Sequence, residues 1–193
     1  MAPICKLNSP DCLPRAEQVI LEGGLLVYPT DTLYGFGVDA RSPTALELLT
    51  RIKGRGGPYS IAVASLEMVE THGDIPDERR AFVLSHLPGK VTIIVKARTQ
   101  GLSSRVLGPG GTVGIRMPDH PFPTKLTERL NFPITTTSVN RTGEPPLNDP
   151  AAIARQFAND VDLIVDGGPL PASRGSTVYD LTGKEIAVLR NPS

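Results

Sequence analysis

The sequence predicts an α/β fold of α+β-like character, a twisted mixed sheet with flanking helices, and three observations favour it. Apolar runs at residues 25–28 and 91–96 have the length and composition of buried strands. Residues 45–52 instead repeat apolar side chains at helical spacing. Strand-like and helix-like segments intermix without strict alternation, which favours a mixed sheet over a purely parallel one. Because the 193 residues contain no linker or repeat, we expect a single domain over residues 1–193.

The first third of the chain is expected to form an irregular arm, a helix, a strand, a helix and a strand, at residues 1–13, 16–21, 25–28, 43–53 and 60–64. Ser42 is the expected N-cap of the second helix, and Pro43 fits its first turn. Gly54 then ends that helix. Cys5 and Cys12 would close only a short loop if they were bonded, so we expect both to be free thiols.

The rest of the chain continues the mixture of helices and strands. Helices are expected near residues 66–71, 76–86, 121–130 and 150–157. Strands are expected at residues 91–96, 112–116, 133–137 and 161–165, with a terminal hairpin of residues 176–181 and 186–189. The glycine-rich segment 108–111 is the expected loop before the strand at 112–116.

Composition and charge exclude several functional classes. Lys and Arg total 20, as do Asp and Glu, so no global basic field would draw the chain to nucleic acid or membrane. No apolar run approaches the roughly 20 residues that span a bilayer, and the N-terminus lacks a signal-peptide pattern. We therefore expect a soluble, cytoplasmic protein. The three histidines have no Cys or His partner at ligand spacing, which argues against structural zinc.

Polar side chains follow the strand at 25–28, where open α/β sheets usually bind ligands. If the segment after Pro29 is extended, Thr30, Thr32 and Tyr34 share one face and present three hydroxyl groups. Gly35 would allow the backbone to approach a ligand closely.

Lys53 and Arg55 suggest a polyphosphate site. Two residues apart on a regular helix they would diverge, but an extended Lys-Gly-Arg would place both cations on one side. The alternative is that they only complement the dipole at the helix C-terminus.

Polar residues recur at four more strand ends. Arg116 could hold a carboxylate bidentately, or form a surface ion pair. Another set alternates along one face and could bind a ribose, a phosphate or a polar substrate, or only stabilise a turn: Thr136, Ser138 and Asn140. Ser176 begins the terminal hairpin and Arg190 ends it.

Six short motifs occur in an order typical of one family: PTDTLYG, KGR, GIRMPDHP, TTTSVNRTG, STVYDL and a final LR. This set resembles the YrdC-like family of threonylcarbamoyl-AMP synthases, from about residue 14 to residue 190. Its signature pairs Lys-x-Arg with Ser-x-Asn, here Lys53-Gly54-Arg55 and Ser138-Val139-Asn140. The resemblance is to the short, single-domain type, and it implies a twisted mixed sheet around a large concave pocket.

The resemblance also implies a reaction, in which L-threonine, bicarbonate and ATP give threonylcarbamoyl-adenylate and pyrophosphate. The product supplies partner proteins that modify an adenosine in certain tRNAs, and Mg²⁺ is implied with ATP. Facing the nucleotide would be Lys53, Arg55, Thr112, Ser138, Asn140 and Arg190, of which Lys53 and Arg55 would act on the phosphates. Facing threonine would be Thr32, Tyr34, Arg116, Thr136 and Ser176.

The chain departs from the family pattern at Gly56-Gly57-Pro58, at Thr142, where Ser is common, and at Asn191-Pro192 after the final Leu-Arg. Gly56-Gly57-Pro58 shortens the usual link after Lys-x-Arg, which puts contacts from this loop to the nucleotide in question. Asp31 could act through a water molecule or only cap its turn. Two rival functions also remain. One rival is a paralogue that forms a different carbamoyl-adenylate. The other is an RNA-binding module, although zero net charge and the lack of aromatic-rich basic runs count against it.

Overall fold

The computed structural model describes residues 1–98 and 101–192. Its helices are α1 (Cys12–Leu21), α2 (Pro43–Lys53), α3 (Leu66–His72), α4 (Asp77–His86), α5 (Pro121–Leu130), α6 (Pro150–Phe157) and the 3-10 helix η1 (Ser104–Val106). Its strands are β1 (Ile4–Lys6), β2 (Leu26–Pro29), β3 (Tyr34–Gly37), β4 (Ile61–Ala62), β5 (Gly73–Asp74), β6 (Val91–Ala97), β7 (Thr112–Arg116), β8 (Ile134–Thr135), β9 (Thr137–Ser138), β10 (Leu163–Asp166), β11 (Thr177–Asp180) and β12 (Ala187–Arg190).

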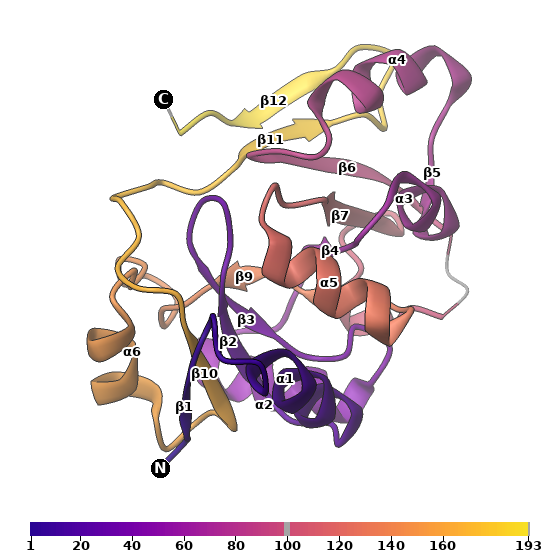
Figure 1. Cartoon of the computed structure of the whole chain (residues 1–193). Helices are drawn as coiled ribbons and strands as arrows, with labels where there is room; N and C mark the ends of the chain where they lie inside the picture. The colour runs from indigo at the N-terminus through magenta and orange to yellow at the C-terminus, as the bar shows by residue number, and fades with distance from the viewer. Residues whose placement is uncertain (99–100, 193) are drawn as a thin grey trace.

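The strands form two mixed sheets, which confirms the predicted fold class (Figure 1). The first has the order β1-β10-β2-β3-β9, with β1, β10 and β2 parallel and β3 antiparallel to both of its neighbours. The second has the order β12-β11-β6-β7-β4-β8, and β5 pairs with β6 outside this order. The predicted terminal hairpin is the antiparallel pair β11 and β12.

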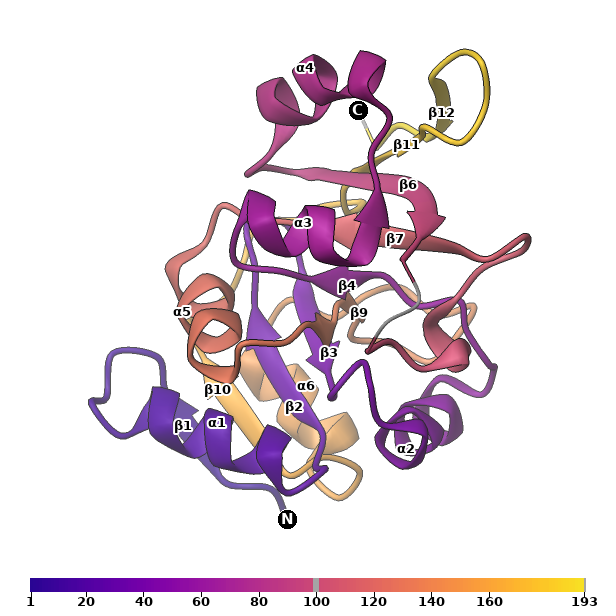
Figure 2. The ribbon, with the colours of Figure 1, turned by 90° about the vertical axis from the view of Figure 1, so that its right-hand side faces the viewer.

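Helices cover both faces of the first sheet, because its strands are apolar on both sides. Leu26 and Tyr28 pack with α1 and α5, whereas Val27, between them, packs with α2 and α6. Figure 2 shows α1 and α5 on one side of β2 and β3 and α2 on the other. This alternation follows from the two-residue period of a strand. Because Val27 packs in one core with α2, the end of β2 has a fixed position relative to the end of α2.

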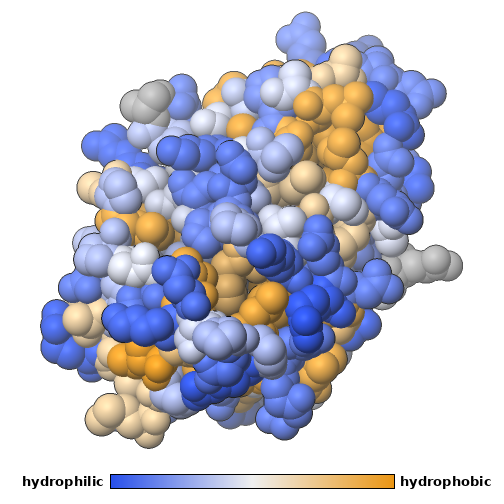
Figure 3. Space-filling view, viewed as in Figure 1, coloured by the Kyte–Doolittle hydropathy of each residue, from blue (hydrophilic) through white to orange (hydrophobic). Residues whose placement is uncertain are grey.

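The second sheet carries α3 and α4, whose Val69 and Val83 pack in the same core as Ile93 of β6. In the view of Figure 3 the surface is largely hydrophilic, and hydrophobic residues gather near α4, a helix that carries the exposed Leu84. None of the helices within residues 1–98 and 101–192 is long and apolar enough to cross a membrane.

The predicted irregular arm is wrong in part, since residues 4–6 form β1, parallel to β10. β1 has only three residues, of which Cys5 alone is buried, so no apolar pattern marks it. Its partner lies about 160 positions away in the chain, beyond the reach of local patterns. The helix that follows starts at Cys12 rather than at residue 16. Both cysteines are free and buried, as expected.

The strand predicted at 133–137 is interrupted at Thr136. Its first part, β8, pairs with β4 in the second sheet, and its second part, β9, pairs with β3 in the first. Thr136 donates its backbone N–H to the carbonyl of Ser60, outside either ladder. This segment therefore crosses from one sheet to the other, and the site described below lies at the crossing.

Candidate functional site

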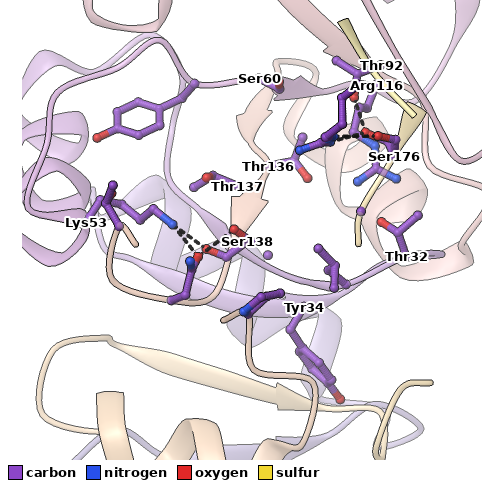
Figure 4. Close-up of a pocket in the computed structure, with 18 of the residues that line it drawn as sticks. Thr32, Tyr34, Lys53, Ser60, Thr92, Arg116, Thr136, Thr137, Ser138 and Ser176 are labelled. Carbon is purple, nitrogen blue, oxygen red and sulfur yellow. Dashed lines mark hydrogen bonds between the residues drawn. The ribbon is translucent and has the colours of Figure 1, made fainter. Parts of the chain in front are cut away.

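A pocket of about 410 Å³ opens where the two sheets meet, within the range of about 300–1,000 Å³ common for small-molecule sites. Its walls come from the β2–β3 turn, the end of α2, the β6, β7 and β9 strands, and the segments around Ser176 and Arg190. In Figure 4, Lys53 and Ser138 lie on one side of the pocket, and Thr92, Arg116 and Ser176 lie on the other. Thr136 and Thr137 lie between the two groups.

The first side is built on Lys53, the last residue of α2, which is only 3% exposed. Its ammonium donates to the carbonyl of Ser138 at 2.9 Å and to Asn140 Oδ1 at 2.7 Å. Asn140 Oδ1 also accepts from Ser138 Oγ at 2.7 Å. An ammonium has three N–H donors, so these two bonds leave a third that can reach a ligand. Lys-x-Arg and Ser-x-Asn thus meet, although 85 residues separate Lys53 from Ser138.

Lys53 and Arg55 are not extended as the sequence analysis expected. Lys53 is still helical, and Gly54 reverses the chain with φ of 69°, a left-handed conformation that glycine adopts without strain. Arg55 is exposed and donates to the carbonyl of Gly56. Both cations nevertheless line the same pocket, as do Pro58 and Tyr59 of the shortened loop.

The second side is built on Arg116, the last residue of β7, which is 7% exposed. Its Nη2 donates to Asp31 Oδ1 at 2.7 Å, in a pair whose side chains are both buried. Burial lowers the pKa of Arg116, and the Asp31 carboxylate opposes that shift. The alternative of a surface ion pair is therefore excluded, because both side chains of the pair are buried and Arg116 lines the pocket.

Arg190, predicted to face the nucleotide, lies on the same side as Arg116. It donates from Nε to the carbonyl of Ser176 at 2.9 Å and from Nη2 to Ser176 Oγ at 3.0 Å. Ser176 Oγ also lies 2.6 Å from Thr92 Oγ1. Burial, and then the charge of Arg116, lower the pKa of Arg190. Arg190 therefore holds Ser176 in place, opposite to Lys53.

The expected row of three hydroxyl groups does not form, because residues 30–33 make a tight turn between β2 and β3. Thr30 Oγ1 accepts from the backbone N–H groups of Thr32 and Leu33 and does not line the pocket. Thr32 does line it. Tyr34 also lines the pocket, but its hydroxyl donates to the carbonyl of Gly168 at 2.8 Å and accepts from the N–H of Gly167.

Thr112 is the predicted site residue that lies apart from the pocket. It begins β7, and its hydroxyl donates to the carbonyl of Pro109 in the preceding loop. Arg116 lies at the other end of the same strand, and that end faces the pocket. Several residues that line the pocket were not predicted as site residues, among them Thr92 and Arg174. Thr92 had a signal, since it is a polar residue near the start of the apolar run 91–96.

The charges of the pocket have one sign. Five cations line it: Lys53, Arg55, Arg116, Arg174 and Arg190. Among the described residues that line it there is no Asp or Glu. Across residues 1–98 and 101–192, no three His, Cys, Asp or Glu side chains are placed to hold a metal ion. A chain of zero net charge thus concentrates positive charge at one site, with hydroxyl groups and one amide as its other polar groups.

Comparison with known proteins identifies the family. A sequence model of the Sua5/YciO/YrdC family, described as "Telomere recombination", matches residues 18–192. The chain belongs to the Sua5/YciO/YrdC family. It is 31% identical over 188 residues to a Bacillus subtilis protein named threonylcarbamoyl-AMP synthase, covering 96% of this chain and 54% of that protein. The chain thus spans about half the length of this relative.

Solved structures agree with this assignment. The structure of Pyrococcus abyssi Sua5 complexed with L-threonine has a TM-score of 0.90 and 29% identity, and the match covers 100% of this chain and 57% of that one. The structure of Escherichia coli YciO has a TM-score of 0.91 and 28% identity, with 100% and 96% coverage. The predicted family and fold are therefore confirmed.

Proposed function

We propose that this chain forms threonylcarbamoyl-adenylate and pyrophosphate from L-threonine, bicarbonate and ATP. The observation that carries the proposal is the two-sided cationic pocket. Lys53, which donates to Ser138 and Asn140, suits a phosphate chain. Arg116, which is held by Asp31 from 85 residues earlier in the chain, suits the carboxylate of an amino acid. Relatives named threonylcarbamoyl-AMP synthase and the Sua5 structure with L-threonine support this function.

The chemistry needs no protein nucleophile. The amine of threonine reacts with bicarbonate, losing water, to give a carbamate. A carbamate oxygen then attacks the α-phosphorus of ATP, a new P–O bond forms, and the bond to pyrophosphate breaks. Catalysis rests on holding the reactants in line, which can supply about 7–11 kcal/mol, and on stabilising charge on the phosphates.

The predicted residues that line the pocket have roles that follow from their positions. Lys53 and Arg55 hold the phosphates, and Ser138 and Asn140 orient Lys53 and contact the nucleotide. Arg116 receives the threonine carboxylate. Four other side chains shape the threonine end: Thr32, Tyr34, Thr136 and Ser176. Arg190 supports Ser176 and adds positive charge to the pocket.

Mg²⁺ enters this scheme with ATP as part of the substrate. The donor groups of the described pocket are hydroxyls, one amide and cations, without the carboxylates that dedicated Mg²⁺ sites use. The pocket therefore does not fit a resident Mg²⁺ ion, and the phosphates and water would hold it.

The decisive experiment incubates the protein with ATP, bicarbonate and labelled L-threonine. We expect labelled adenylate and pyrophosphate in equal amounts, formed only when all three substrates are present. Pyrophosphate release with another carbamoyl donor but not with threonine would favour the paralogue. Steeply salt-dependent RNA binding without ATP turnover would favour the RNA-binding module.

The product is a mixed anhydride that transfers its acyl group readily, so a tRNA-modifying partner must consume it. We place both steps in the cytoplasm, where ATP and tRNA are available. Direct RNA binding by this chain is not required by the scheme.

The value of kcat/KM for ATP should fall at high pH. Burial, and then the nearby charge of Arg55, lower the pKa of Lys53 to about 8. A lysine loses its positive charge as the pH rises through its pKa, so kcat/KM for ATP should fall above about pH 8. Initial rates at subsaturating ATP across this range measure the effect. In Lys53→Arg the charge persists, and a fall at the same pH in that variant would contradict the assignment to Lys53.

A further inference from the structure

Asp31 lies in the tight turn between β2 and β3 and contacts two groups of the strand end that carries Arg116. Its Oδ1 accepts from Arg116 Nη2 at 2.7 Å, and its Oδ2 accepts from the backbone N–H of Asp119 at 3.1 Å. The side chains of Asp31 and Arg116 are 6% and 8% exposed. One buried carboxylate thus ties both the side chain of Arg116 and the chain just after it to the turn that bears Thr32.

We propose that Asp31 is a positioning residue that holds the Arg116 guanidinium in the orientation that receives the substrate's carboxylate. The inference rests on the proposed function and deepens it. Asp31 does not line the pocket, so it would act through Arg116 rather than touch the substrate.

The hydrogen bonds of Arg116 support this role. Within the described part of the chain, the bond to Asp31 is the only side-chain hydrogen bond that its guanidinium makes, and its buried Nε has no partner. An arginine side chain has many rotamers, and here a single carboxylate selects among them. The unpartnered Nε also means that the site is not complete until a ligand or water supplies an acceptor.

Asp31 also has an electrostatic effect on substrate binding, and its sign is opposite to that of the positioning effect. Asp31 partly neutralises Arg116, so a neutral residue at position 31 would leave a stronger positive field for an anionic substrate. If charge alone decided binding, removal of Asp31 would tighten it. If orientation decides binding, removal of Asp31 weakens it, because a guanidinium binds a carboxylate through two parallel hydrogen bonds only when the two groups are coplanar. The sign of the change therefore separates the two effects.

The test compares the affinities for L-threonine and L-threoninamide, whose ratio reports the contact to the carboxylate. Calorimetric titration of the full chain should show that wild type prefers threonine by about tenfold, as expected for a charge-assisted contact. Asp31→Asn keeps the size of the side chain and should lower this preference about fivefold or more. Asp31→Glu restores the charge and should recover part of it.

Asp39→Asn is the matched control. Asp39 also accepts from an arginine guanidinium and a backbone N–H, both of Arg41, but it lies outside the pocket. It should leave the preference within about twofold of wild type. Circular dichroism and thermal unfolding of each variant establish that it is folded.

A double-mutant cycle makes the proposal falsifiable even if Asp31→Asn is destabilised. Arg116→Gln removes the group that Asp31 would position, so adding Asp31→Asn in that background should change threonine affinity by less than about twofold. An equal loss in both backgrounds, an unchanged preference, or tighter threonine binding in Asp31→Asn would overturn the positioning role. Absence of threonine-dependent pyrophosphate release in wild type would instead reject the proposed function.

Discussion

Replacing Lys53 with alanine is expected to lower the rate of adenylate formation by about 10- to 100-fold. Removing a hydrogen bond to a charged group is worth about 1.5–3 kcal/mol, and each 1.4 kcal/mol is a factor of about ten. Lys53 lies within the pocket, is buried, and is oriented by Ser138 and Asn140, so its charge is screened less by water than that of a surface lysine. Release of pyrophosphate at saturating threonine measures the loss.

Lys125→Ala is the control for this substitution, since Lys125 is exposed on α5 and does not line the pocket. It should retain the wild-type rate within about twofold. Of the two signature cations, Arg55 should have the smaller effect when replaced with alanine, because it is exposed and its guanidinium donates to the adjacent carbonyl of Gly56. Full turnover by Lys53→Ala, with the fold intact by circular dichroism, would remove Lys53 from the phosphate site.

Much of the fold could be predicted because helix and strand periodicity is a local property. Ser42, Pro43 and Gly54 mark both ends of α2 in the sequence and in the structure. The failures lie where pairing is decided by distant segments. β1 forms only because β10 offers an edge, and the strand expected at 133–137 divides between two sheets because β4 and β3 each take one part of it. Neither partner is visible within a short window of sequence.

The sequence predicted which residues line the site better than it predicted where their side chains point. Polar residues at strand ends marked Arg116, Ser138 and Asn140, and these line one pocket. The direction of a side chain was not predictable, since it depends on the turn that carries it. The turn at residues 30–33 removes Thr30 from the pocket, and the Tyr34 hydroxyl bonds to Gly168. Thr112 lies apart from the pocket because it begins β7, and only the other end of that strand, with Arg116, reaches the pocket.

Replacing Arg116 with alanine should have the other large effect, and it should fall on threonine rather than on ATP. The guanidinium lies across the pocket from Lys53 (Figure 4), so in the proposed assignment its loss removes a charged contact to threonine and leaves the phosphate contacts in place. We expect KM for threonine to rise about tenfold or more and KM for ATP to change by less than about twofold. Steady-state rates with each substrate varied in turn measure both constants.

The same substitution also tests the buried ion pair, because it leaves the Asp31 carboxylate, which is 6% exposed beside Arg116, without its cation. Removing one partner of a buried pair lowers the free energy of unfolding by about 3–5 kcal/mol, so the assay temperature must lie well below the melting temperature of the variant. Arg116→Lys separates the two effects. It keeps a charge for Asp31 and most of the stability but loses the planar fork, and a lysine cannot bind a carboxylate and Asp31 with the same geometry. The lysine variant should therefore unfold near the wild-type temperature while its KM for threonine remains raised. Equal increases in both KM values, in either variant, would mean that Arg116 does not discriminate between the two substrates and that the carboxylate assignment is wrong.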